Sequence, residues 1–287
     1  MRSFLFAPGN HERRAAKVFQ SGADVAILDL EDAVATTEKL AARALVVAAL
    51  QVPRSCLGYV RVNGFDTAWC WDDLQAIVGP RLDGVMLPKV ERPEQLQTLD
   101  WVLTQLERAR GLPVGSLDLL PIIETALGAE QLPALARATP RVRRLAFGGA
   151  DYTLDLGLQW TAGEQELDYL RSRLVHVSRA AGLEAPIDTV TVQVKDAARF
   201  SASAARARQF GLTGKLLIHP DQVPLCHAAF TPSAAELARA QRIVAEFAVA
   251  QAAGIAALRI DGEFIDYPVV EQARRLCASV PSPESPR

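Results

Sequence analysis

The sequence predicts an α/β protein built as a (β/α)8 TIM barrel, followed by a C-terminal extension of helices and a hairpin. Short apolar runs alternate with longer amphipathic stretches at intervals of roughly 25–35 residues, which suits strand–helix–strand crossovers. Eight such units fit into roughly the first 230 residues, as a closed barrel requires. A doubly wound sheet is the alternative, but its Gly-x-Gly-x-x-Gly turn is missing here.

The expected strands are rich in Val, Ile, Leu and Phe and do not alternate cleanly with polar residues. This pattern is typical of a parallel sheet that is covered on both faces. In chain order the strands are expected at residues 3–7, 25–30, 57–62, 84–87, 118–123, 144–147, 187–191 and 215–218.

Amphipathic helices are expected between the strands, at residues 12–21, 37–50, 93–110, 128–137, 164–181 and 195–210. Pro93 suits a first helical turn, where its missing N–H costs no hydrogen bond. Four glycines stand where helices should stop: Gly22, Gly111, Gly182 and Gly211.

The pattern changes after residue 230. Ser233 and Glu236 have the spacing of a capping box, and Asp261-Gly262 indicates a tight hairpin turn. The elements expected here are a helix over 233–251, a hairpin of 255–260 and 263–265, and a helix over 269–278. The chain thus divides into a barrel at 1–230, an extension at 231–278 and a frayed, proline-containing tail at 279–287.

Composition excludes several classes of function. The 287 residues carry 31 Lys and Arg against 33 Asp and Glu, a formal charge of −2 that gives no overall field for nucleic acid or an anionic membrane. No apolar run approaches the roughly 20 residues of a membrane helix. The four cysteines form no Cys-x-x-Cys pair. Because the chain runs from Met1-Arg2-Ser3 straight into an apolar strand, we expect no signal peptide and a cytoplasmic enzyme.

The chemistry of a barrel lies where its strands end, and nearly every expected strand here ends in charged or backbone-special residues. A lone charge after a strand is usually a solvated loop residue, but convergence at one rim indicates an active site. The rim residues are Asp29, Glu31, Asp32, Arg61, Lys89, Glu124, Asp151 and His219.

Glu124 and Asp151 lie one strand–helix unit apart, so their carboxylates are expected on adjacent strand ends. Two carboxylates that close repel each other and raise one pKa, and a divalent cation removes the conflict. Oxygen donors without a Cys or His cluster favour Mg²⁺, which keeps waters and leaves positions for substrate oxygens. The structural alternative is that Glu124 caps a helix and Asp151 pairs with an arginine.

Seven motifs occur in order, in a resemblance that covers roughly residues 2–275. They are RSFLFAPGN at 2–10, AILDLEDAV at 26–34, VRVN at 60–63, VMLPK at 85–89, PIIET at 121–125, FGGAD at 147–151 with DLG at 155–157, and KLLIHPDQ at 215–222. Together they resemble the citrate lyase β-subunit-like family, within the wider class of HpcH/HpaI aldolases, citrate lyases and malyl-CoA lyases. The resemblance implies a Mg²⁺-dependent barrel that makes or breaks a carbon–carbon bond in a 3-hydroxyacyl-CoA thioester, such as citryl-, malyl- or citramalyl-CoA.

The resemblance also implies roles for single residues. Glu124 and Asp151 match the metal carboxylates, Glu124 also facing substrate, and Arg61 matches a substrate-binding arginine. Asp266 matches an aspartate that a neighbouring subunit's C-terminal segment delivers, in a family whose members are usually trimers. The chemistry agrees: cleavage needs positive charge where the thioester enolate develops, which Arg61 supplies, and an acid such as Asp266 to protonate that enolate.

Further positions match those that hold the CoA moiety in related lyases: Phe6, Arg13 and Lys17. Arg13 and Lys17 lie four residues apart on one helix face, where such pairs are more often simply solvated. His219 either donates to substrate or belongs to a turn. The remaining rim groups are expected to orient metal-bound waters or Arg61 rather than bind the metal: Asp29, Glu31, Asp32 and Lys89.

Three other functions stay open beside a stand-alone CoA-thioester lyase. The chain could be the β subunit of a complex whose substrate arrives on an acyl-carrier protein. It could be a free-acid aldolase that uses a pyruvate enolate without CoA. It could also be a non-catalytic scaffold, although the joint retention of Glu124, Asp151 and Arg61 argues against that.

Overall fold

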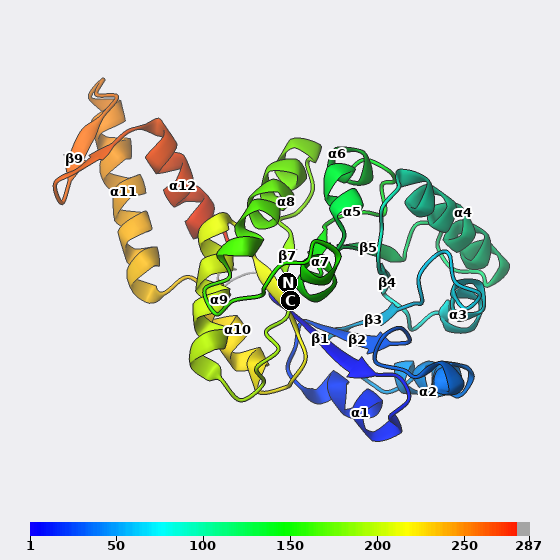
Figure 1. Ribbon diagram of the computed structural model, residues 1–287. Coiled ribbons are helices and arrows are strands. Elements are labelled where there is room, and N and C mark those ends of the chain that lie inside the picture. The colour runs from blue at the N-terminus through cyan, green and yellow to red at the C-terminus, as the bar shows by residue number, and fades with distance from the viewer. Residues whose placement is uncertain (280–287) are drawn as a thin grey trace. The chain divides into compact units, whose positions relative to one another are not determined.

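Eight parallel strands close into a barrel in chain order, so that β1 pairs with both β2 and β8 (Figure 1). The structure, a computed structural model, describes residues 1–279. It confirms the predicted (β/α)8 architecture. The strands are β1 (Ser3–Pro8), β2 (Val25–Asp29), β3 (Leu57–Arg61), β4 (Gly84–Leu87), β5 (Asp118–Ile123), β6 (Ala146–Phe147), β7 (Ile187–Asp188) and β8 (Gly214–Leu217).

Helices surround the barrel on its outside (Figure 1). They are α1 (Glu12–Lys17), α2 (Lys39–Leu50), α3 (Cys70–Ile77), α4 (Pro93–Ala109), α5 (Ala126–Glu130), α6 (Leu132–Leu135), α7 (Gly149–Asp155), α8 (Asp168–Ala181), α9 (Ala197–Phe210) and α10 (Gln222–Phe230). Short 3-10 turns adjoin α1, α2 and α8, namely η1 (Val18–Gln20), η2 (Thr36–Glu38) and η3 (Gln165–Leu167).

The structure differs from the sequence prediction in a few elements. The single helix expected over 128–137 is wrong: α5 and α6 are separate, and Pro133 has no N–H to donate to the carbonyl of Ala129. Strands β6 and β7 are only two residues long. Helices α3, α7 and α10 were not predicted, and α7 matters most because it carries Asp151.

The strands bury both of their faces, as their apolar composition predicts. One set of side chains fills the barrel interior, including Phe4, Ile27, Tyr59 and Met86. The opposite faces pack against the helices in a larger apolar layer. Because both faces are occupied, the barrel interior is a packed core.

The chain divides into two compact units after Phe230. The second unit contains α11 (Ala234–Ala252), the hairpin β9 (Leu258–Ile260) and β10 (Glu263–Ile265), and α12 (Tyr267–Ala278). Its capping box at Ser233 and Glu236 is present. Asp261 and Gly262 both have positive φ, as a tight hairpin turn requires. Of the tail predicted at 279–287, residues 280–287 lie outside the described residues.

The four cysteines are free thiols and form no disulfide. Within residues 1–279, none of the helices has the length and apolar character needed to cross a membrane.

Candidate active site at the barrel mouth

A cavity of about 430 Å³ opens at the carboxyl ends of the strands. Its lining residues all belong to the first unit and lie at or just beyond the ends of β1, β2, β3, β5, β6, β7 and β8. Its polar lining includes Asp29, Asp32, Arg61, Glu124 and Asp151, and its apolar lining includes Phe6, Ile122, Val190, Leu216 and Ile218. The lining therefore combines acidic and apolar side chains.

Glu124 follows β5 directly and is 2% exposed. Its Oε1 accepts a hydrogen bond of 2.7 Å from the backbone N–H of Lys89. Gly148 leaves room for the carboxylate, because a Cβ at that position would lie 2.2 Å from Glu124 Oε2. Burial, reinforced by the charge of Asp151, raises the pKa of Glu124 to about 8.

Asp151 lies in the first turn of α7 rather than at the end of a strand, which corrects the expected position. Its carboxylate lines the same cavity as Glu124, 3.9 Å from the Lys89 ammonium. The structural alternative for this pair is wrong. Thr125, and not Glu124, caps α5, and Asp151 faces a lysine.

Arg61, the last residue of β3, is held by two buried carboxylates. Its Nε and Nη2 donate to the two oxygens of Asp29 at 2.8 and 2.5 Å, and its Nη1 lies 2.9 Å from Glu31 Oε2. The guanidinium also lies over the Phe6 ring, 4.9 Å from its centroid. Burial opposes the charge, but Asp29 and Glu31 outweigh it, so the pKa of Arg61 is raised and the residue stays cationic.

Lys89 contacts carboxylates at the mouth through both its backbone and its side chain. It has a φ of 51°, in the left-handed region that non-glycine residues rarely adopt. Its Nζ lies 2.7 Å from Glu31 and 3.4 Å from Asp32. The ammonium therefore offsets part of the negative charge beside Asp151, and these carboxylates raise the pKa of Lys89 against the effect of burial.

A second cavity of about 560 Å³ adjoins the first, and Phe6, Pro8 and Ile218 line both. It brings together three of the residues predicted to contact CoA or substrate: Arg13, Lys17 and His219. His219 is also part of a turn, since its Nδ1 accepts from the backbone N–H of Asp221 at 3.2 Å. Sequence reasoning missed Arg14, which lines this cavity beside Arg13; the basic run Arg13-Arg14 was the available signal.

Asp266 belongs to the second unit, and the structure describes it only within that unit. It is the N-cap of α12, and its carboxylate accepts a hydrogen bond from the backbone N–H of Val269 at 3.4 Å. Two residues close to Asp266 in the chain are exposed: Phe264 exposes 64% of its surface and Tyr267 exposes 52%. Within the second unit, the contact that the structure gives the Asp266 carboxylate is this helix cap.

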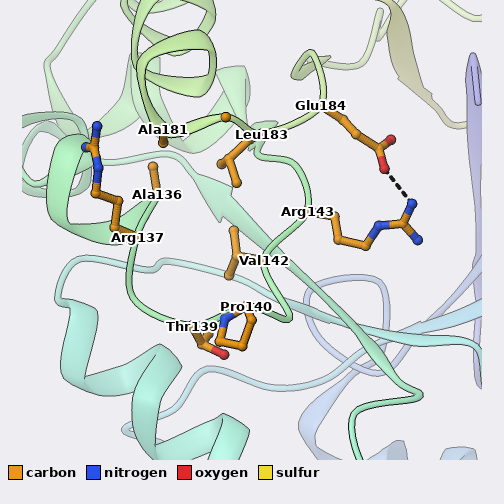
Figure 2. Close-up of a pocket in the computed structure, with 10 residues that line it drawn as sticks. Ala136, Arg137, Thr139, Pro140, Val142, Arg143, Ala181, Leu183 and Glu184 are labelled. Carbon is orange, nitrogen blue, oxygen red and sulfur yellow. Dashed lines mark hydrogen bonds and ion pairs between the residues drawn. The ribbon is translucent and has the colours of Figure 1, made fainter.

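Another pocket lies at the opposite end of the barrel, between the segments that precede β6 and β7. In Figure 2 the side chains of Arg143 and Glu184 point toward one another, and they form an ion pair of 2.6 Å. This pocket contains none of the predicted site residues. The candidate chemistry is therefore at the mouth.

Fold and site together define a (β/α)8-barrel enzyme with an acidic, metal-compatible mouth. The chain belongs to the HpcH/HpaI aldolase/citrate lyase family, which matches residues 2–220. It is 35% identical over 277 residues to the citrate lyase subunit beta of Leuconostoc mesenteroides subsp. cremoris, covering 96% of this chain and 91% of that protein. It is 34% identical over 295 residues to the L-malyl-CoA/beta-methylmalyl-CoA lyase of Cereibacter sphaeroides, covering 95% and 92%.

A solved structure is also similar. The CitE protein of Mycobacterium tuberculosis, in complex with magnesium, acetoacetate and coenzyme A, superposes with a TM-score of 0.77 at 29% identity. The similarity covers 96% of this chain and 97% of that chain. The match therefore includes the extension as well as the barrel.

Proposed function

We propose that the protein is a Mg²⁺-dependent carbon–carbon lyase that cleaves, or in reverse forms, a 3-hydroxyacyl-CoA thioester such as citryl-, malyl- or citramalyl-CoA. The carrying observation is that Glu124, Asp151 and Arg61 line one cavity. The names of the relatives, citrate lyase subunit beta and malyl-CoA lyase, support this class of reaction. The magnesium and coenzyme A in the similar CitE structure support the cofactor and the thioester.

The donor set at the mouth fits Mg²⁺. Glu124 and Asp151 supply hard carboxylate oxygens. Among residues 1–279, no group of three or more His, Cys, Asp or Glu is placed to bind a metal, so these side chains alone would not fill its coordination sphere. Waters and substrate oxygens would complete the six positions, as Mg²⁺ prefers. When bound, Mg²⁺ supplies Lewis-acid polarisation of the oxygen on the carbon that becomes the ketone.

Proton competition should make metal affinity depend on pH. The metal-free Glu124 carboxyl, with its pKa of about 8, must lose its proton before it can bind Mg²⁺. We therefore expect affinity to rise about tenfold per pH unit up to about pH 8 and then to level. Because this folded pKa exceeds the unfolded value, the group stabilises the metal-free fold at low pH and loses that contribution as pH rises to about 8.

Isothermal titration with Mg²⁺ between pH 6 and pH 9 measures this dependence. Glu91→Gln, an exchange at a carboxyl outside the cavity lining, should keep the slope and serves as the control. A flat affinity profile would show that no raised carboxyl pKa governs the metal site.

Arg61 is suited to stabilise the thioester oxygen as it becomes negative. A guanidinium has five N–H donors. Two serve Asp29 and one faces Glu31, so two remain for a ligand in the cavity that Arg61 lines. Because Asp29 and Glu31 hold the group in place, it needs no reorganisation when charge develops.

Cleavage balances without any oxidant. The substrate hydroxyl gives up its proton to solvent water. The electron pair of the bond between the second and third carbons moves into the thioester as an enolate, and the third carbon becomes the ketone of the released acid. The enolate carbon then takes up one proton and gives acetyl-CoA. We assign that proton to Asp266 of a neighbouring subunit, within a homo-oligomer that we expect to be a trimer.

The second cavity is suited to the CoA arm. Arg13 and Lys17 would pair with its phosphates, and Phe6 would contact the arm where the two cavities adjoin. His219 would donate to the thioester end. An acyl-carrier subunit remains the alternative source of the same phosphopantetheine thioester.

A screen of citryl-, malyl- and citramalyl-CoA with Mg²⁺, monitoring free oxo acid, tests the proposal. We expect turnover by this chain alone. Arg13→Ala/Lys17→Ala should raise KM for the CoA ester about tenfold, since a hydrogen bond to a charged group is worth about 1.5 kcal/mol. The exposed pair Arg81→Ala/Arg108→Ala is the charge-matched control.

The possible outcomes of the screen separate the competing functions. Inactivity on every free CoA ester, with activity restored by an acyl-carrier partner, would favour the complex subunit. Turnover of free hydroxy acids, unaffected by Arg13→Ala/Lys17→Ala, would favour the CoA-independent aldolase. Inactivity with CoA esters, with an acyl-carrier partner and with free hydroxy acids would favour the non-catalytic scaffold.

A site shared between subunits predicts complementation. Asp266→Asn should lose turnover but keep its helix cap, because asparagine caps as well as aspartate. The exposed Phe264 and Tyr267 suit a segment that docks on another subunit. Mixed oligomers of Asp266→Asn and Arg61→Ala chains should therefore regain part of the activity that each variant lacks alone.

Co-refolding the two inactive variants and measuring turnover against their mixing ratio checks this. Two differently tagged copies of Asp266→Asn serve as the control mixture. Mixtures that stay inactive although mixed oligomers are isolated would assign the whole site to one chain.

A further inference from the structure

The first turn of α7, which carries Asp151, is held by the side chain of the residue that follows β7. The backbone N–H of Gly149 donates a 2.7 Å hydrogen bond to Oγ1 of Thr189, the residue that follows β7. Thr189 is 1% exposed and lines the mouth cavity. The contact is close, because a Cβ on Gly149 would lie 2.8 Å from that hydroxyl oxygen. The sequence contained no signal that pairs these residues.

Asp188, the residue before Thr189, helps to fix the chain that follows α7, through Arg171 and Glu164. Asp188 is fully buried and accepts from Arg171 at 2.9 Å and from Lys215 at 2.5 Å. Arg171 also donates to Glu164 at 2.6 Å. Glu164 has a left-handed φ of 55°, so the chain beyond α7 is fixed in an uncommon conformation.

Consecutive residues of one strand end therefore anchor the segment that bears Asp151. Thr189 holds its beginning at Gly149, and Asp188, through Arg171, holds its end at Glu164. The buried ion pairs of Asp188 fix the position of the end of β7. The hydroxyl of Thr189 then fixes the start of α7 relative to that strand end. Asp151 lies two residues from the Thr189 contact.

We propose that Thr189 is a positioning residue for the metal site, setting the separation of Asp151 from Glu124 through the first turn of α7. The inference rests on the proposed function. It follows from the demand of Mg²⁺ and similar ions for near-ideal ligand geometry, which a shift of the helix start would spoil. Thr189 acts here through Gly149 and contributes no metal ligand.

Binding of Mn²⁺ by the whole protein without substrate, followed by electron paramagnetic resonance, tests this. Mn²⁺ shares the oxygen preference of Mg²⁺. Thr189→Val keeps the shape of the side chain but removes the acceptor for Gly149, and it should weaken Mn²⁺ binding about tenfold or more. Thr189→Ser keeps the hydroxyl and should bind Mn²⁺ close to wild type.

Hydrogen exchange of the peptide over residues 148–156 gives a readout that needs no metal. It should be faster in Thr189→Val than in Thr189→Ser, with the rest of the barrel unchanged. If Thr189→Val does not fold, Thr189→Ala against Thr189→Ser gives the same comparison with less crowding.

Each outcome decides the inference. Wild-type Mn²⁺ affinity in the variants that lack the hydroxyl overturns it, and so does equal weakening in Thr189→Ser, which would indicate packing rather than the hydrogen bond. A wild-type protein that binds no Mn²⁺ would instead overturn the proposed metal site itself.

Discussion

Glu124→Gln is expected to lower kcat at least about a thousandfold, because Lewis-acid stabilisation is worth several kcal/mol and each 1.36 kcal/mol is about tenfold in rate. Glutamine keeps the volume of the side chain and an oxygen for the Lys89 amide. It removes the negative charge that a divalent ion requires. The remaining activity should no longer depend on Mg²⁺, which steady-state kinetics over a range of Mg²⁺ concentrations will show.

Stability measurements separate loss of chemistry from loss of fold. Because the pKa of Glu124 is raised to about 8, its charge is unfavourable in the metal-free protein above that pH. Glu124→Gln should therefore melt at a higher temperature than metal-free wild type at pH 9, although its kcat is about a thousandfold lower. Asp151→Asn should lose Mg²⁺ dependence in the same way.

Glu130→Gln is the matched control for these carboxyl exchanges. Glu130 ends α5, and its side chain is 69% exposed. It should retain full turnover. Wild-type kcat with intact Mg²⁺ dependence in Glu124→Gln would refute the metal assignment.

Arg61→Ala is expected to lower kcat by about 10²–10³, the usual effect of removing one preorganised donor to a developing oxyanion. It should also destabilise the protein by about 3–5 kcal/mol, because Asp29 and Glu31 lose the partner of a buried ion pair. Steady-state kinetics and urea unfolding measure the two effects independently.

Two further measurements show whether the loss of activity is chemical. Guanidinium ions at low concentration should restore part of the turnover of folded Arg61→Ala by occupying the vacated position between Asp29 and Glu31. Arg54→Ala is the control, since Arg54 pairs with Asp83 outside the mouth cavity and should affect stability without lowering kcat. A folded Arg61→Ala with unchanged kcat would remove Arg61 from the mechanism.

Most of the fold could be predicted from the sequence because its signals are local. The run at 118–123 is apolar and short, and β5 has those bounds. Pro93 and Gly182 mark helix ends where the structure has them. The helix at 128–137 failed, because Pro133 breaks a pattern that is amphipathic throughout.

That Glu124, Arg61 and Asp29 would share one end of the barrel could be predicted from the sequence, but their arrangement there could not. Strand order alone brings Glu124, Arg61 and Asp29 to one rim, because parallel strands end at the same edge of a barrel. Two details were beyond reach. Asp151 lies on an unpredicted helix, and Lys89 adopts a left-handed backbone that its residue type disfavours. Only surrounding contacts impose such a conformation.

The sequence by itself determined the barrel, the family and the acidic rim, since apolar periodicity and short motifs are properties of neighbouring residues. The tertiary structure alone decided that Asp29 and Glu31 clamp Arg61, that Gly148 makes room for Glu124, and that Thr189 holds the start of α7. These contacts join residues far apart in the chain. Their distances depend on how whole strands and helices pack, which no local pattern encodes.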